Sequence, residues 1–512
     1  MSEFIYEAIN DRIECKYGKE NINSYGKISK MKISKKISHN IFRYPFVIFF
    51  VYTLLVIITV KILSAKVLSE NKLEDGFLSH DSYCYYTRSV EFAGFIKSNQ
   101  VNLDLIHKNI YEGFGVAVIV GCVQYLLGPY KIVLYALNAI LHSLSAYLLF
   151  IILYSIYQNR RYSFYATLPF LLFVTPMYWY TQLLKDTFTI FGFFLFLYAM
   201  LLFCNIHKGN REKLLKGVPI FLCGVIISYL SRNYFLEIFR VLTFFIVSTF
   251  FVFIALRVKG KWKEVTLYKG VIAITLSVFI LAILVNEERF KPLTSSKIYY
   301  IPFINKDAGG EKSIDSSSIN MSEAKQKASL NYTTRYLKDK DGTVKEDQFS
   351  YLDKLLAKIK AVRFTFNLNE GRTSLDTDVV FNNNMDLIKY LPTAVGIGLF
   401  APFPAQLFKG TGFWDTDGFM NFIIFAEMVI VYILVLGLVF IIKNIKNRFN
   451  FFIVFAISFS MTTLYGLMIS NVGTLHRMRY PYLMIIVGSG LIGWISFFDS
   501  KKLKCYQNRI SD

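Results

Sequence analysis

The 512-residue sequence contains few charged residues: Asp, Glu, Lys and Arg make up only 18% of it, whereas hydrophobic residues make up 54%. Soluble globular domains carry roughly 25% charged residues, so this deficit excludes an ordinary soluble protein. Acidic residues are especially scarce, because 36 Asp and Glu stand against 57 Lys and Arg and leave a formal net charge of +21. Such an excess is typical of the basic cytoplasmic loops of a membrane protein, and we expect no nucleic-acid partner.

Two further features are missing. The six cysteines are scattered and include no CxxC pair, which excludes the usual zinc-binding spacings. No cleavable signal peptide is evident, because the mostly polar residues 1–43 precede the first apolar run and are too many for an ordinary n-region. Within this tail, the basic repeat GKISKMKISKKIS fits a plain positive-inside anchor, with contact to anionic lipid headgroups as the alternative.

Long apolar runs account for most of the remaining sequence. A run of about 20 apolar residues is long enough to cross a membrane as a helix. Ten runs meet this description: 44–63, 131–156, 162–180, 187–205, 214–231, 234–256, 268–285, 419–442, 450–470 and 480–498.

Two shorter runs, 110–128 and 391–408, are ambiguous. If neither crosses the membrane and the basic N-terminus is cytoplasmic, every short basic loop lies on the cytoplasmic side, whereas a crossing by 110–128 alone would invert all the later loops. We therefore predict ten spans, with both termini cytoplasmic and both ambiguous runs on the outer face. Glycines interrupt the first run, and we expect the prolines of the second, Pro392, Pro402 and Pro404, to break any continuous helix.

These patterns predict an all-α polytopic membrane protein of about ten transmembrane helices, with two long outer-face loops that contain juxtamembrane helices. In the second loop, SYLDKLLAKIKAVRFTF places leucine and isoleucine at helical spacing, which fits either a helix on the outer leaflet or one packed on the loop's own core. The expected parts are a basic tail (1–43), a transmembrane core (44–285) with its outer loop (64–130), a long outer loop (286–418), C-terminal spans (419–498) and a basic tail (499–512).

Acids and cations from distant segments gather on the outer face in this topology. A carboxylate there can accept the proton of an attacking hydroxyl, and arginines can grip phosphate oxygens and stabilise the charge of a departing phosphate. The pattern suits transfer of a group from a phosphate-linked lipid. The outer-face candidates are Asp81, Asp186, Arg232, Arg363, Arg372, His476, Arg477 and Arg479, with His80, Tyr85 and Lys185 as accessory residues.

The order of several segments is distinctive. An acidic first outer loop (HDSYCYY) precedes an apolar juxtamembrane stretch (YEGFGVAVIVGCVQYLLGPY), a span with an internal Asn (NAILHSLSAYLLF), a basic turn (QNRR) and a span that ends in FVTPMYWYTQLLKD. Near the C-terminus, RMRYPYLMIIV forms an Arg-rich outer turn. This order resembles the GT-C superfamily of polytopic glycosyltransferases, such as protein mannosyltransferases, aminoarabinose transferases and rhizobial-type lipopolysaccharide sugar transferases. The resemblance covers residues 44–205 well and the last 60 residues loosely.

The resemblance implies a glycosyltransferase that moves a sugar from a polyprenyl-phosphate donor to a glycan, lipid or protein acceptor outside a bacterial inner membrane. It implies that Asp81 is the catalytic base and that Asp186 is the second acid. No cofactor is expected with certainty. The first loop has His-Asp where relatives have two adjacent acids, so a divalent metal remains an option without support.

Simpler interpretations stand beside these roles. Asp81 could be a solvated loop acid, Asp186 could cap a helix start, and Lys185 could be an interfacial lysine. Inside the spans, Asn138, His142 and Glu427 also fit a transporter or flippase, although no internal repeat pairs the two halves of the chain. A polysaccharide polymerase is a closer rival, since the long loop with Arg363 and Arg372 suits it as well.

Overall fold

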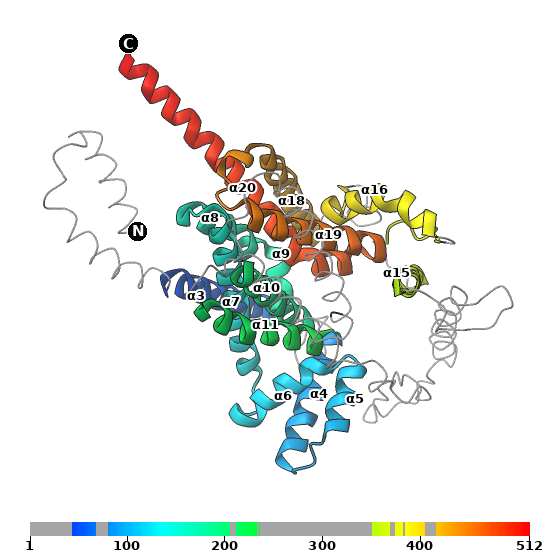
Figure 1. Cartoon of the computed structure of the whole chain (residues 1–512). Coiled ribbons are helices and arrows are strands. Elements are labelled where there is room, and N and C mark those ends of the chain that lie inside the picture. The colour runs from blue at the N-terminus through cyan, green and yellow to red at the C-terminus, as the bar shows by residue number, and fades with distance from the viewer. Residues whose placement is uncertain are drawn as a thin grey trace, which may run out of the picture.

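A computed structural model describes residues 43–67, 80–204, 211–232, 235, 351–368, 374–381, 384–404 and 416–511 (Figure 1). Within these ranges the chain forms helices joined by short turns, together with one isolated β-bridge between Ser374 and Asn471. The all-helical class predicted from the sequence is therefore confirmed for the described residues. Three predicted regions lie outside them, namely the N-terminal tail, nearly all of the spans at 234–256 and 268–285, and the polar part of the long loop.

Six helices in the described ranges are long and apolar enough to cross a membrane, as judged by length and composition. They are α3 (Arg43–Val67), α7 (Lys131–Tyr157), α10 (Lys185–Cys204), α18 (Thr416–Leu436, which continues as 3₁₀ turns), α19 (Arg448–Met468) and α20 (Val472–Ser511). Their side chains share one large core that also includes parts of α8, α9 and α11. A helical membrane protein is thus supported, while the count of ten spans and their orientation stay predictions.

The apolar run at 162–180 is divided into two helices. Helix α8 (Arg160–Leu172) ends where Phe173 adopts an extended backbone, and the short helix α9 (Val174–Tyr180) follows. Pro176 lies in the first turn of α9, where its missing N–H leaves no hydrogen bond unmade. The residues after α9 are not helical until α10 begins at Lys185. The short helix α9 and the turn after it therefore connect α8 to α10.

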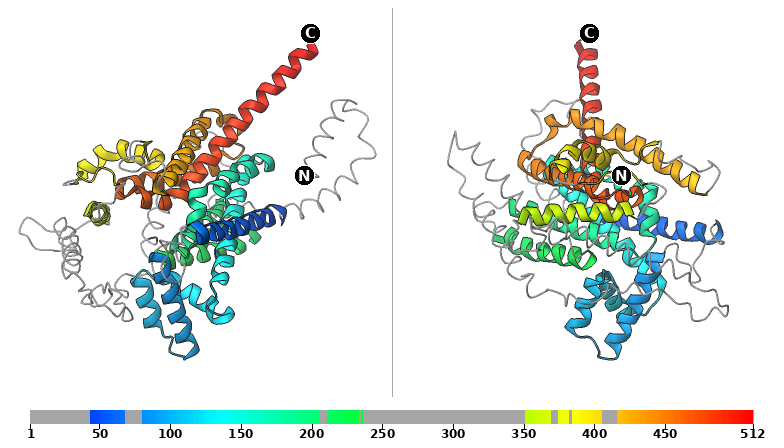
Figure 2. Two further views of the ribbon diagram at one scale, coloured as in Figure 1. Left: turned by 180° about the vertical axis from the view of Figure 1, so that it is seen from behind. Right: turned by 90° about the vertical axis from the view of Figure 1, so that its right-hand side faces the viewer.

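Three helices between α3 and α7 form a layer at one end of the molecule (Figures 1 and 2). They are α4 (His80–Lys97), α5 (Leu103–Tyr111) and α6 (Gly115–Leu127), and α4 packs along α6. Gly113 has φ +83° and separates α5 from α6, as glycine can at low steric cost. With 13 residues, α6 is about 20 Å long, which is shorter than the hydrocarbon core of a bilayer.

The second ambiguous run differs from its prediction. Helix α16 (Asn384–Phe400) continues through Pro392, so the expected break at that proline is wrong, although the helix does end before Pro402. Close packing supports the helix: a Cβ atom on Gly398 would overlap the Thr462 carbonyl oxygen, and one on Gly466 would overlap that of Ala394, across the α16–α19 crossing. Tertiary packing of this kind outweighs the lost hydrogen bond of one proline.

The helix expected in the long loop is present as α15 (Tyr351–Leu368). Leu356 and Ile359 pack in a small cluster with Phe381, Leu387 and Leu467. These contacts join α15 to α16 and to the candidate span α19, so the core is not formed by the loop alone, and the choice between the two expected arrangements stays a prediction.

Helices α10 and α11 (Arg211–Ser231) form a close antiparallel pair. A Cβ atom at Gly192 would stand 2.9 Å from the carbonyl oxygen of Gly224, so only glycine permits this approach. At the far end of the pair, the Thr189 hydroxyl donates to the Ser231 hydroxyl over 2.8 Å. The pairing brings the first residues of α10 beside the residue that follows α11, which is Arg232.

Candidate functional site: a cluster of acids and cations

One carboxylate joins two arginines from distant parts of the chain. The Arg232 guanidinium donates a hydrogen bond to Oδ1 of Asp186, and Arg477 Nη1 lies 3.8 Å from Oδ2. The exposed fraction of the side chain is 12% for Asp186, 9% for Arg232 and 22% for Arg477. Both carboxylate oxygens are therefore engaged, and the group lies at the border between core and solvent.

Local structure explains how these three side chains meet. Asp186 lies in the first turn of α10, where an acid is favoured by the helix dipole. The N–H of Arg232 still bonds to Ser228 in the last turn of α11. Arg477 follows the start of α20, which Asn471 caps by accepting a hydrogen bond from the Thr474 N–H over 3.1 Å. Three helix ends thus converge on one point.

Lys185, Tyr85 and Asp81 extend the cluster. The charges of Asp81, Asp186, Arg232 and Arg477 all act on the Lys185 ammonium group. Burial is the main cause that raises the pKa of the Tyr85 hydroxyl, while the Arg232 charge lowers it and the charges of Asp81 and Asp186 raise it further.

Asp81 is an exposed residue in the first turn of α4. Lys185, Arg232 and Arg477 are cations, and Asp81 and Asp186 are anions, so the cations exceed the acids by one charge. This surplus favours an additional anion at the cluster.

The segment between α9 and α10 connects Asp81 to the rest of the cluster. The Asn138 side-chain amide donates to the carbonyl oxygens of Tyr180 (3.0 Å) and Gln182 (2.8 Å). The Leu183 N–H donates to the hydroxyl of Ser82 over 3.0 Å. Since Ser82 follows Asp81 in α4 and Leu183 lies two residues before Lys185, this bond fixes the start of α4 against the start of α10.

Trp179 packs against Arg477. The guanidinium carbon of Arg477 lies 4.8 Å from the centroid of the Trp179 ring, within the range of a cation–π contact. Trp179 and its neighbour Tyr178 are partly exposed, whereas most residues of α9 are buried. Sequence reasoning missed Trp179, and its only signal was a position six residues before Lys185.

Arg479 does not join the cluster. Its guanidinium is fully buried and donates to the carbonyl oxygens of Ile397 (3.0 Å), Gly398 (2.6 Å) and Ala401. These carbonyls lie at the C-terminal end of α16, where the last four have no partner within the helix. The contacts of Arg479 are those of a helix cap, and they do not support the expected grip on phosphate.

Arg363 is likewise engaged elsewhere. It is almost fully buried and donates to the Asp376 carbonyl over 2.8 Å and to the Tyr390 hydroxyl over 3.2 Å. It therefore holds α15, the chain around Asp376 and α16 together. His476 is buried, and neither of its ring nitrogens has a hydrogen-bond partner among the described residues. Arg372 lies outside the described residues, and His80 is the first residue of α4.

The polar residues inside the spans have different surroundings. Asn138 holds the end of α9, as described above, and Glu427 Oε1 accepts a hydrogen bond from the Thr175 N–H at the start of α9 over 2.9 Å. The His142 ring packs against the rings of Phe170 and Tyr180, with centroids 4.7 and 4.0 Å away. Two of the three residues therefore serve to hold one short helix.

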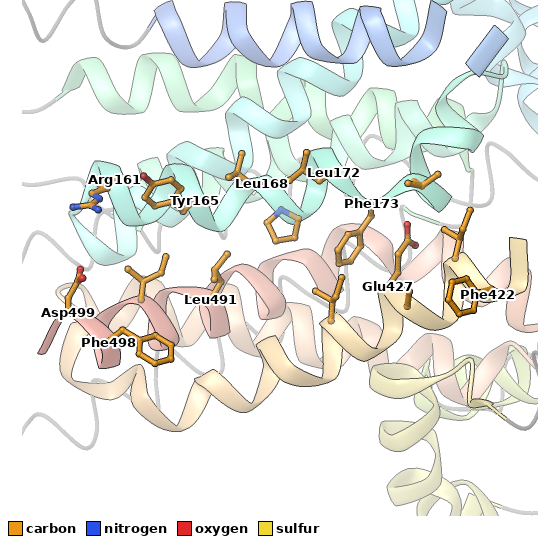
Figure 3. A pocket seen from close by; sticks show the side chains of 16 residues that line it. Arg161, Tyr165, Leu168, Leu172, Phe173, Phe422, Glu427, Leu491, Phe498 and Asp499 are labelled. Carbon is orange, nitrogen blue, oxygen red and sulfur yellow. The ribbon is translucent and has the colours of Figure 1, made fainter. Parts of the chain in front are cut away.

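An apolar groove of about 800 Å³ runs between α8, α9, α18 and α20 (Figure 3). Arg161 and Asp499 lie at one end of it, and Glu427 and Phe422 lie at the other (Figure 3). The side chains between these ends are almost all apolar. None of the charged residues of the cluster lines this groove.

Within the described ranges, no group of three or more His, Cys, Asp or Glu side chains is placed to hold a metal ion. Comparisons of the chain with protein-family models, with curated proteins and with solved structures gave no match. The geometry and charge of the cluster are therefore the basis for a functional assignment.

Proposed function

We propose that this chain is a membrane glycosyltransferase that moves a sugar from a polyprenyl-phosphate donor to a glycan, lipid or protein acceptor on the outer face. The observation that carries the proposal is the shared carboxylate of Asp186, which holds Arg232 and Arg477 together at a partly exposed place. A pair of guanidinium groups fixed in this way is suited to a phosphate group. The apolar helices of the chain suit a donor that is tethered to the bilayer.

The two acids have different roles in this proposal. Asp186 has both oxygens engaged by arginines, so it orients the cations and is a poor proton acceptor. Asp81 is exposed at the start of α4, where an acceptor hydroxyl has access. Its carboxylate takes the proton of that hydroxyl as the oxygen attacks the anomeric carbon.

The bond from the anomeric carbon to the phosphate oxygen then breaks, and its electron pair leaves with the phosphate. The phosphodiester of the donor carries one negative charge, and the departing phosphate monoester gains a second. Arg232, Arg477 and Lys185 stabilise that additional charge, which is worth most in the transition state. The proton held by Asp81 returns to solvent after the product leaves.

The contacts of Asn138 and Glu427 support the transferase over the transporter. A proton or ion relay needs polar groups that are available to change partners. The amide nitrogen of Asn138 and Oε1 of Glu427 are instead engaged at the two ends of α9. Their place inside the membrane is accounted for by that structural task.

Purified full-length protein tests the proposal in an assay with a polyprenyl-phosphate sugar and candidate acceptors, in which free polyprenyl phosphate is measured. We expect Asp81→Asn to reduce turnover at least about a hundredfold with little change in thermal stability, because an exposed acid contributes little to folding. The matched control is Asp104→Asn, since Asp104 is also an exposed acid in the first turn of a helix of the same layer. Equal turnover in the two variants would show that Asp81 is not the base.

A further inference from the structure

Glu427 is a carboxyl group inside an apolar helix. Its exposed fraction is 5%, and it lies within the candidate span Asn421–Phe440. Burying such a group is costly unless a hydrogen bond compensates for it. The bond that compensates Oε1 comes from the Thr175 N–H, over 2.9 Å, whereas Oε2 has no hydrogen-bond partner among the described residues.

That bond satisfies a specific need of α9. Thr175 is the second residue of the helix, and the first N–H groups of a helix have no acceptor within it. Water is a poor substitute at this position, because Glu427 lies at the end of an apolar groove that opens between the spans (Figure 3). Glu427 therefore fixes the start of α9, while Asn138 fixes its end.

The position of α9 determines the position of Arg477. Trp179 is the sixth residue of α9, and its ring lies against the Arg477 guanidinium. A shift or loosening of α9 would move the ring, and the guanidinium would lose the surface that directs it toward Asp186 and an incoming phosphate. The chain of contacts runs from Glu427 through Thr175 and Trp179 to Arg477.

We infer that Glu427 is a positioning residue, which holds α9 so that Trp179 orients Arg477 for the donor phosphate. This inference rests on the proposed function for its catalytic consequence, but its structural part does not. It also separates two uses of a membrane-embedded acid. A relay needs the proton of the carboxyl group, whereas positioning needs only an oxygen that accepts a hydrogen bond.

Two substitutions distinguish these uses. Glu427→Gln keeps a carbonyl oxygen in the place of Oε1, so we expect turnover within about threefold of wild type. Glu427→Leu removes the acceptor, and we expect turnover to fall about ten- to a hundredfold, as it does when a catalytic group is misplaced by about 1 Å. The loss should appear mainly in kcat, because Arg477 matters most as the phosphate departs.

The fluorescence emission of Trp179 tests the inference independently of catalysis; we call this measurement the emission arm. The chain has four tryptophans, so replacing Trp262, Trp414 and Trp494 with Phe leaves Trp179 as the only indole emitter. Arg477→Ala in this background defines the emission of Trp179 without its cation. We expect Glu427→Leu to shift the emission toward this reference and Glu427→Gln to keep the wild-type spectrum.

The matched control is Tyr432→Phe. Tyr432 is also on α18, and its hydroxyl donates to the Phe400 carbonyl over 2.6 Å, so the variant removes one hydrogen bond of α18 without touching α9. It should keep both the Trp179 emission and the turnover of the parent. Its thermal stability also calibrates the general cost of losing one such bond.

Two results overturn the inference. The first is a Glu427→Leu protein with wild-type Trp179 emission. The second is a Glu427→Gln protein that is as impaired as Glu427→Leu, which would mean that the proton is needed. If wild-type protein transfers no sugar, the proposed function fails, and the emission arm still decides whether Glu427 positions α9.

Discussion

Arg477 and Arg479 lie two residues apart in one helix but in two different environments. Arg479 is fully buried, and carbonyl oxygens at the end of α16 accept its hydrogen bonds. Arg477 is partly exposed, shares a carboxylate with Arg232 and stacks on Trp179. A buried guanidinium whose terminal nitrogens donate to backbone carbonyls is part of the fold, whereas one held by a shared acid and open to solvent is suited to an incoming anion.

The same contrast separates two larger regions. One includes Arg363, which joins α15 to α16 and to the chain around Asp376, and Arg479, which joins α20 to α16. The other includes Asp81, Lys185, Asp186, Arg232 and Arg477, which come from four helix ends. Substitutions in the first region should affect stability, and substitutions in the second should affect turnover.

The largest expected effect is that of Arg479→Leu. It leaves the buried carbonyls of Gly398 and Ala401 without their Arg479 donor and removes one of the two donors of Ile397, which we expect to cost about 3–5 kcal/mol of unfolding free energy. Little folded protein should be recovered, as measured by size-exclusion chromatography and thermal unfolding. Recovery of stable, folded Arg479→Leu protein would remove the distinction between the two arginines.

Arg477→Lys should have the opposite profile. Lysine keeps the positive charge but not the planar fork, so we expect kcat to fall about a hundredfold while the donor Kd changes less. The unfolding temperature should stay close to that of wild type, because the side chain is partly exposed. A stability loss as large as that of Arg479→Leu would place Arg477 in the structural region instead.

Asp186→Asn should have a smaller effect on turnover. The amide oxygen can still accept from Arg232, but the two guanidinium groups then face each other without the neutralising charge. We expect about a tenfold decrease in kcat, which is less than the hundredfold expected for Asp81→Asn. The order of these two variants in the same transfer assay tests which acid is the base, and the reverse order would exchange their roles.

The smallest expected effect is on the pH dependence of stability, and it concerns Tyr390 in the region of Arg363 and Arg479. Burial is the main cause that raises the pKa of Tyr390, and the hydrogen bond to Asp376 raises it further while the Arg363 charge lowers it. A raised pKa means that the folded protein keeps the phenol proton to higher pH than the unfolded chain does. The corresponding stability is present below the unfolded pKa of about 10 and is lost as pH rises above it.

Between about pH 9 and 11, the unfolding temperature of Tyr390→Phe should therefore fall less than that of wild type. At neutral pH the variant should be less stable than wild type by about 1 kcal/mol. Asp81, which lies outside this region, offers the control: Asp81→Asn should keep the alkaline slope of wild type. If the unfolding temperatures of wild type and Tyr390→Phe fell equally with pH, the alkaline loss of stability would not come from Tyr390.

Some of the structure could be predicted from the sequence. Apolar runs of about 20 residues predict long helices because a helix is the simplest way to satisfy backbone groups in lipid, and α7, α10 and α19 follow such runs closely. The division of 162–180 could not be predicted from hydropathy. The start of α9 is held by a hydrogen bond that the Thr175 N–H donates to Glu427, which lies 252 residues away in the chain.

The candidate site was predictable to a similar degree. Charge bias placed Asp186, Arg232 and Arg477 on one face, and the structure brings them into contact. The sequence could not separate Arg477 from Arg479. At about 100° per residue they point some 200° apart around α20, and only the packing of α16 and α10 decides which side faces the acid.

The most direct test of the account is whether phosphate leaves a donor lipid as a glycosidic bond forms. Purified protein in proteoliposomes is given a polyprenyl-phosphate sugar and an acceptor, and both the free polyprenyl phosphate and the new glycoside are quantified over time. The account predicts equal amounts of the two products from wild type, and about a hundredfold slower formation of both by Arg477→Lys. Passage of intact sugar lipid across the membrane, without release of polyprenyl phosphate under any acceptor condition, would contradict it.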